Sequence, residues 1–176
     1  MPNRRPRKMI NEGTTGFAIG SLIALDDPSD FYISRRSVAR IDVRVYWIGE
    51  QTAVTQASDL NRQSVILISS FDYSGLCDYV EDPINKVTLA VNVEGHKRAL
   101  SALSVKRATY MLGYRAPVDL IQLEMNIQNL HSHPIDQSEI YLIINKSVKN
   151  SRQIMDRLEA SYLAIYLNNV DVETDN

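Results

Sequence analysis

The sequence predicts a single α+β domain in which a largely antiparallel sheet packs against helices. Strict alternation of apolar and polar residues, clearest at 38–49, is typical of strands with one buried and one solvated face. Segments with helical spacing of apolar residues lie between some of these strands. Two later strands are separated by only a short turn at 130–137, which favours an antiparallel hairpin over a parallel sheet.

The length and composition indicate one globular domain with two polar ends. A chain of 176 residues is long enough for one substantial core and short for two. Residues 1–16 contain four basic side chains and no apolar period, so we expect a flexible basic arm there. The globular domain is expected at 17–170, followed by an acidic tail at 171–176.

The first half of the domain is expected to begin with an apolar segment at 17–25, which is either a strand or a docking segment. A strand follows at 38–49. A helix is expected over 60–71, with Ser58 or Asp59 as its N-cap, and the acidic segment 72–83 suits a loop. The residues of 38–49 that we expect to face the core are Ile41, Val43, Val45 and Trp47.

The second half is expected to begin with a strand at 86–94, because Val87, Leu89, Val91 and Val93 alternate with mostly polar residues. Helical propensity is high over 96–103, and residues 105–112 either continue or restart that helix before Gly113.

The last elements are expected to be two strands and a helix. Residues 118–130 alternate as a strand, His131-Ser132-His133-Pro134 turns the chain, and 139–145 forms a central strand. A closing helix is expected over 149–167, with an apolar stripe at helical spacing.

Several functional classes find no support in the sequence. The longest apolar runs fall far short of the ~20 residues that cross a bilayer, and no secretory signal follows the basic start. The glycine-bearing segment 13–20 lacks the lysine of a phosphate-binding loop, which argues against a nucleotide site. His131 and His133 are expected to be plain turn residues rather than metal ligands. Cys77 is the single cysteine, so it has no partner for an internal disulfide. We therefore expect no cofactor, no metal site and no enzymatic activity, and we expect a cytoplasmic protein whose membrane contact is peripheral.

The strongest functional pattern is electrostatic. No acidic residue lies between Glu94 and Asp119, although the overall formal charge is −2. One interpretation is a solvated surface balanced by the acidic residues at 78–82. The other is a contact for RNA, RNA-bound protein or anionic lipid. The candidate binding residues, including those of the arm and one further pair, are Arg4, Arg5, Arg7, Lys8, Arg35, Arg36, Lys97, Arg98, Lys106, Arg107 and Arg115.

The order and size of these segments also resemble a known family. The short basic arm, the strand ARIDVRVYWIG and the later segment GYRAPVDLIQLEMNI are similar to those of rhabdovirus matrix proteins, especially plant-infecting, cytorhabdovirus-like members, over about residues 36–130. The resemblance implies a peripheral membrane protein of the virion that self-associates, condenses the nucleocapsid and links it to the envelope during assembly.

Three hypotheses follow from the sequence. The first is a viral matrix-type structural protein whose partners are the nucleocapsid, the anionic membrane surface, other copies of itself and host factors. The second is a small viral RNA-binding or host-directed accessory protein, such as a silencing suppressor. The third is an enzyme with a nonstandard site.

Overall fold

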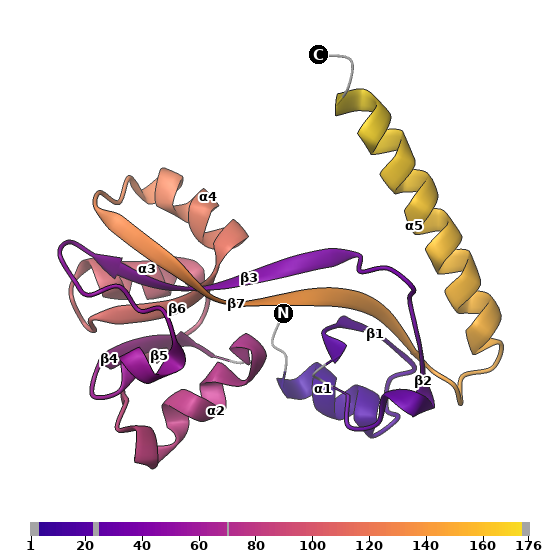
Figure 1. Ribbon diagram of the computed structural model, residues 1–176, viewed down its shortest axis with the longest axis horizontal. Helices are drawn as coiled ribbons and strands as arrows, with labels where there is room; N and C mark the ends of the chain where they lie inside the picture. Colours follow the sequence, from indigo (N-terminus) through magenta and orange to yellow (C-terminus); the bar gives the residue numbers. More distant parts are fainter. Residues whose placement is uncertain (1–3, 23–24, 70, 174–176) are drawn as a thin grey trace. The chain divides into compact units, whose positions relative to one another are not determined.

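The structure, a computed structural model, describes residues 4–22, 25–69 and 71–173, and it confirms the α+β class (Figure 1). The contacts of the chain divide it into two compact units. Unit 1 consists mainly of Ile41–Ser138, and unit 2 consists of Pro6–Arg40 together with the chain from Glu139 onward. That residues 17–170 act as one globular domain stays a prediction.

The sheet of unit 1 contains both antiparallel and parallel pairs. Its strands follow the order β7-β3-β6-β4-β5. Strand β4 is parallel to both β5 and β6, whereas β3 is antiparallel to β6. The bounds are β3 Ala39–Ile48, β4 Ser64–Ile68, β5 Thr88–Val93, β6 Tyr110–Tyr114 and β7 Leu130–Asn145, and both β3 and β7 also contribute residues to unit 2.

Three helices cover the sheet of unit 1. Helices α3 (His96–Ser104) and α4 (Arg115–Met125) pack beside one another and against β6, and α2 (Leu76–Glu81) packs near β5 on the other side (Figure 1). They enclose one continuous apolar core that includes Val65, Leu100 and Leu112, all of which are fully buried. Burial of this apolar surface is the main stabilising contribution to unit 1.

Unit 2 is built around the second half of β7. Strands β1 (Phe17–Gly20) and β2 (Phe31–Ile33) both pair with it in antiparallel orientation. Helix α1 (Arg4–Asn11) contributes the buried Ile10 to one small apolar cluster, and α5 (Ser151–Glu173) contributes Met155 to another. The apolar core of the described part of unit 2 is thus divided into smaller clusters than that of unit 1.

Several predicted elements are confirmed. The strands expected at 38–49, 86–94 and 139–145 correspond to β3, β5 and the second half of β7, and the helices expected at 96–103 and 149–167 correspond to α3 and α5. In β3, the predicted core residues Val43, Val45 and Trp47 are buried.

The prediction that the second face of β3 is solvated is wrong at Tyr46. This residue is only 2% exposed. Gly113 on the neighbouring strand lies close to both the Tyr46 ring and Val118 of α4, so α4 packs over this side chain.

Two predicted helices are wrong. The helix expected over 60–71 is replaced by β4, in which Val65, Ile66, Leu67 and Ile68 are all buried. The sequence of a strand that is covered on both faces is a continuous apolar run. Such a run also contains apolar residues three and four positions apart, which is the spacing expected of a helix. The helix expected over 105–112 ends instead at Ser104, and β6 begins at Tyr110.

The predicted strand over 118–130 and the predicted loop over 72–83 are also wrong. Residues 115–125 form α4, in which Val118 is buried while Leu123 is 80% exposed. An exposed leucine therefore produced an apparent alternation that does not reflect burial. The segment 72–83 contains α2, whose buried Cys77 and Val80 face the core.

The hairpin expected at 130–137 is wrong, because Leu130–Asn145 is one continuous strand. Within the segment predicted as an arm, residues 4–11 form α1. At the other end, α5 extends through Glu173, and the final residues of the predicted tail, 174–176, lie outside the described residues. Of the helices that the structure describes, none combines the length and the apolar character needed to cross a membrane.

Candidate functional site

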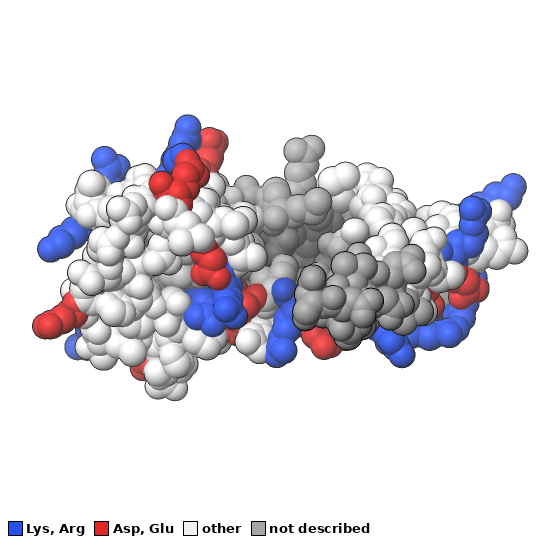
Figure 2. All heavy atoms as spheres, turned by 90° about the horizontal axis from the view of Figure 1, so that it is seen from above, with Lys and Arg blue, Asp and Glu red and all other residues white. Residues whose placement is uncertain are grey.

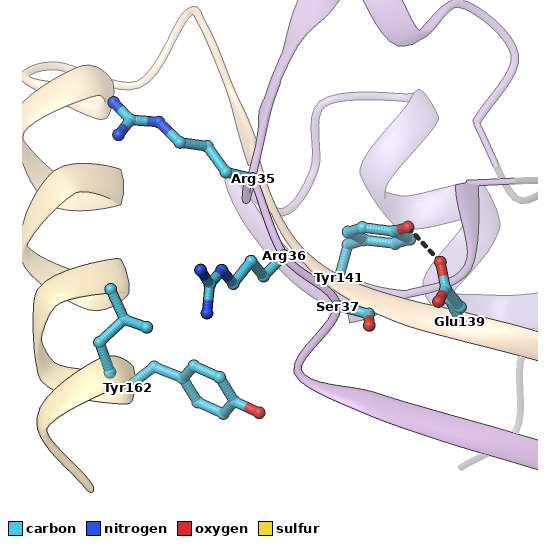
Figure 3. A pocket seen from close by; sticks show the side chains of 7 residues that line it. Arg35, Arg36, Ser37, Glu139, Tyr141 and Tyr162 are labelled. Atoms are coloured by element: carbon cyan, nitrogen blue, oxygen red, sulfur yellow. Dashed lines mark hydrogen bonds between the residues drawn. The ribbon is translucent and has the colours of Figure 1, made fainter. Parts of the chain in front are cut away.

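A cavity of about 410 Å³ lies within unit 2 (Figure 3). Its walls come from three places: the segment between β2 and β3, the strand β7, and the middle of α5. Pockets of about 300–1,000 Å³ are the usual size of small-molecule sites. The lining residues are Arg35, Arg36, Ser37, Glu139, Tyr141, Tyr162 and Leu163.

Backbone hydrogen bonds hold the segment that carries the two arginines against β7. Ser34 N donates to Leu142 O at 3.0 Å, and Leu142 N donates to Ser34 Oγ at 3.1 Å. The same hydroxyl donates to Arg36 O at 2.8 Å, and Val38 N donates to Ile140 O at 2.7 Å. The backbone on both sides of Arg36 is therefore fixed, which orients the side chain at the cavity wall.

The two neighbouring arginines have different electrostatic environments. Arg35 Nε lies 3.8 Å from Glu159 Oε2, and the backbone N–H of Arg35 donates to the same carboxylate. The Arg36 guanidinium has no hydrogen bond or ion pair with any residue that the structure describes, and Figure 3 shows it projecting toward α5 and Tyr162. Arg36 is thus the basic group of this cavity that is free to bind an anion.

A carboxylate and a phenol form the β7 wall. Glu139 and Tyr141 are two residues apart on a strand, so both side chains leave the same face. Tyr141 OH donates to Glu139 Oε2 at 2.6 Å, and this bond raises the pKa of Tyr141 because ionisation of the phenol would lose it (Figure 3). Glu139 Oε1 has no partner among the described residues and can accept a hydrogen bond from a ligand.

Tyr162 and Leu163 of α5 form the remaining wall. Tyr162 OH donates to Val38 O at 3.1 Å, which ties α5 to the arginine-bearing segment. The cavity therefore combines one unpaired cation, one carboxylate with a free oxygen, and aromatic surface. Such a set can hold a small molecule that carries both a carboxylate and an ammonium group. In the described part of the chain, no cluster of histidine, cysteine and acidic side chains could hold a metal ion.

Most of the basic residues predicted between Glu94 and Asp119 are compensated by carboxylates. Lys97 pairs with Glu124, Arg98 Nη1 lies 3.0 Å from Glu94 Oε2, and Arg115 Nε lies 3.3 Å from Asp119 Oδ2. On the face shown in Figure 2, several Lys and Arg side chains likewise lie beside Asp and Glu side chains. The compensating acids are Glu94, which precedes α3, and Asp119 and Glu124 of α4, rather than the acidic residues at 78–82.

The other predicted basic residues are dispersed. Lys106 and Arg107 line a separate cavity in unit 1, and the structure describes no carboxylate within ion-pair distance of either. Lys8 lies 3.7 Å from Glu12 Oε1. The backbone of Arg4, Arg5 and Arg7 lies in α1, and their side chains lie outside the described part of the chain.

The fold is similar to that of solute-binding proteins, a class that binds small ligands. Three solved structures illustrate the likeness, each described with an amino acid bound. The GluR0 ligand-binding core in complex with L-glutamate has a TM-score of 0.64 and 12% identity, and the match covers 96% of this chain and 74% of that chain. An ancestral arginine-binding protein bound to arginine has a TM-score of 0.66 and 8% identity, with the same coverage of 96% and 74%.

The third structure is a substrate-binding protein of an ABC uptake transporter from Streptococcus pneumoniae with bound histidine. It has a TM-score of 0.63 and 13% identity, and the match covers 94% of this chain and 68% of that chain. No protein-family model matches the sequence, and no curated protein matches it at a significant level. At these identities the likeness establishes the fold.

These findings overturn the matrix-protein interpretation. The structures that resemble this chain are ligand-binding domains, so the expected family, the viral structural function and the expected partners, namely nucleocapsid, membrane surface, other copies and host factors, are wrong. The similarity to matrix proteins rested on the order of segments. One of those segments, GYRAPVDLIQLEMNI, mainly forms a helix and not the strand on which the resemblance relied.

The sequence pointed to Arg35 and Arg36 but not to the rest of the cavity. Glu139 and Tyr141 share the outward face of a strand that was correctly predicted, so their period of two was the available signal. Tyr162 lies within the helix expected over 149–167, and nothing in the local sequence distinguishes a residue of a cavity wall from a core residue there. Only the fold brings these three segments together.

Proposed function

We propose that this protein binds a small ligand of amino-acid type in the cavity of unit 2, recognising a carboxylate and an ammonium group together. The observation that carries the proposal is that two residues on the walls of one cavity are an arginine, Arg36, with no partner in the described part of the chain, and a carboxylate, Glu139. The proposed activity is binding rather than chemical conversion.

Arg36 is assigned to the ligand carboxylate. A guanidinium offers a planar fork of N–H donors that matches the two oxygens of a carboxylate. Arg35 is less suited to this role, because Glu159 already occupies it. The anchored backbone around Arg36 reduces the entropy lost when its side chain is ordered by a ligand.

Glu139 is assigned to the ligand ammonium. Tyr141 OH occupies Oε2 and leaves Oε1 available, and the phenol holds the carboxylate in a fixed orientation. Tyr141 and Tyr162 supply aromatic surface on which the ligand side chain can pack. The described likeness to structures with bound glutamate, arginine and histidine supports the same ligand class.

Isothermal titration calorimetry with a panel of L-amino acids tests the proposal. Arg36→Ala is expected to weaken the best ligand by about tenfold or more, since a hydrogen bond to a charged group contributes about 1.5–3 kcal/mol. The matched control is Arg157→Ala, which removes an exposed arginine of α5 that does not line the cavity. Glu139→Gln keeps the size of the side chain and an acceptor for Tyr141 while it removes the charge.

Arg36, Glu139 and Arg157 all have exposed side chains, so circular dichroism should show an unchanged fold in all three variants. Binding of an amino acid that is lost in Arg36→Ala and Glu139→Gln, and kept in Arg157→Ala, supports the proposal. Affinity that is the same in all four proteins would place the ligand elsewhere and contradict it.

A further inference from the structure

A second cavity, of about 330 Å³, lies within unit 1. It is bordered by the residues that follow β3, by the first residue of β4, and by the loop from α3 to β6. Its position is separate from that of the unit 2 cavity in both residues and elements, and its volume is at the lower end of the range for small-molecule sites. The inference below is independent of the proposed function.

Two adjacent cations line this cavity without local compensation. Lys106 and Arg107 are exposed, and no carboxylate in the described part of the chain lies within 4.0 Å of their charged atoms. The remaining cations of the same basic stretch are each paired with an acid. Neighbouring like charges repel one another, and a bound dianion would relieve that repulsion.

The end of α3 fixes the backbone that carries the two cations. The α3 helix ends with Lys106 N donating to Leu103 O at 2.9 Å and Arg107 N donating to Ala102 O at 3.0 Å, which is a Schellman motif. The residue at this position is left-handed, with φ of 56° for Lys106, and glycine is favoured there because it lacks a Cβ. Lys86 has the same left-handed conformation, so this geometry fixes where the Lys106 side chain begins and is not by itself a sign of function.

Fixed polar groups complete the cavity. Thr109 N donates to Ser64 Oγ at 2.9 Å, and the two hydroxyl oxygens of Ser64 and Thr109 are 3.1 Å apart. Gln51 adds an exposed amide. One carboxylate, Glu50, also lines the cavity, and its charge opposes that of the two cations.

We propose that this cavity binds a phosphate group, either as inorganic phosphate or as part of a small phosphorylated metabolite. Arg107 supplies the planar fork that matches two phosphate oxygens, and Lys106 supplies a compact point charge. The hydroxyl and amide groups offer further donors to the remaining oxygens. Glu50 weakens the site electrostatically.

The test is a titration at constant ionic strength with inorganic phosphate and with glycerol 3-phosphate, followed by amide chemical shifts. Lys106→Gly is the decisive variant, because it relieves the left-handed strain while it removes the charge. It is expected to keep or raise the melting temperature and to weaken phosphate binding by about tenfold or more. Glu50→Gln is expected to strengthen binding.

The matched control is Lys86→Gly. Lys86 is an exposed lysine in the same left-handed conformation, with φ of 54°, and it does not line the cavity. Its substitution should affect stability in a similar way and leave phosphate binding unchanged. Tighter binding of glycerol 3-phosphate than of phosphate identifies a phosphorylated metabolite, and the reverse identifies the free ion.

Two results would overturn the inference. One is phosphate binding that is equal in the wild type and in Lys106→Gly, which would mean that the two cations serve only the carboxyl end of α3. The other is an equal loss of binding in Lys86→Gly, which would show a general effect of net charge rather than a site.

Discussion

The two cavities contain similar residue types but differ in which charges are free. In unit 2, Glu159 pairs with one of two adjacent arginines, so Arg36 and Glu139 remain as one free cation and one carboxylate. In unit 1, neither of the adjacent cations Lys106 and Arg107 has an acidic partner among the described residues, and Glu50 is the single carboxylate that lines the cavity. Under the two proposals, the ligand class follows from the charges left over after internal pairing rather than from the number of basic residues.

The scaffolds of the two cavities differ as well. The unit 1 cavity borders the large core, since Leu103 and Ala108 belong to both. The unit 2 cavity lies among the smaller clusters of that unit. A core substitution in unit 1 should therefore have a larger effect on stability than any change at either cavity.

The largest expected effect is that of Leu100→Ala in unit 1. Leu100 is fully buried, so its truncation removes apolar contacts and leaves a cavity, which costs about 2–5 kcal/mol of unfolding free energy. Urea unfolding followed by fluorescence of Trp47, the single tryptophan and a unit 1 residue, measures the loss. Val105→Ala, at a position 67% exposed, is the control and should change little. Equal effects of the two substitutions would refute the assignment of the core.

The next largest effect is expected from a substitution that gives the unit 2 cavity the charges of the unit 1 cavity. Glu139→Lys replaces the carboxylate of the unit 2 cavity with a cation, so two adjacent walls carry cations, as Lys106 and Arg107 do in unit 1. Amino-acid affinity should fall by more than about tenfold, and inorganic phosphate should gain affinity at this cavity. Calorimetry with both ligands measures the exchange. If phosphate gains nothing while amino acids still bind, the free charges do not determine ligand class.

A smaller effect is the pH dependence of stability that arises from His96, which belongs to unit 1. Burial lowers the pKa of His96 from 6.5 to about 4, and its Nε2 accepts a hydrogen bond from Tyr114 N at 3.3 Å. Between pH 6.5 and 4 the unfolded chain therefore takes up a proton that the folded chain does not. Stability from this group is present above pH 6.5 and is lost as the pH falls to about 4.

His96→Gln should reduce that part of the pH dependence, because glutamine can accept the same bond without titrating. Urea midpoints measured by Trp47 fluorescence at several pH values test this, and His133→Gln is the control. An unchanged slope between pH 6.5 and 4 in His96→Gln would show that His96 does not cause it.

The smallest expected effect is a difference in salt dependence. A zwitterion has no net charge, whereas both forms of phosphate present near neutral pH are anions, so added sodium chloride should weaken phosphate binding more than amino-acid binding. Titrations at low and high ionic strength measure both. A stronger salt effect on the amino acid would reverse the assignment of the two cavities.

Part of this fold could be predicted from the sequence, and the physical reason differs between elements. Strands β3 and β5 alternate in apolar character and were found. Strand β4 was missed because burial on both faces removes the alternation. Helix α4 was missed because its buried Val118 and half-buried Ile121 share the helix with the exposed Leu120 and Leu123, which imitate a strand pattern.

The candidate sites were harder to predict for a related reason. A basic residue in a sequence carries no information about its partner, and the pairing of Arg35 with Glu159 joins residues far apart in the chain. The left-handed backbone at Lys106 was also not readable, since glycine and not lysine signals that conformation.

The most direct test of the central claim compares an amino acid with two analogues that each lack one charged group. The best L-amino acid, its 2-oxo acid and its decarboxylated amine are titrated in turn, and amide chemical shifts locate the binding. Each analogue is expected to bind about tenfold or more weakly than the amino acid, with shifts concentrated around Arg36, Glu139 and Tyr141. Equal affinity for all three compounds, or shifts confined to unit 1, would contradict the claim.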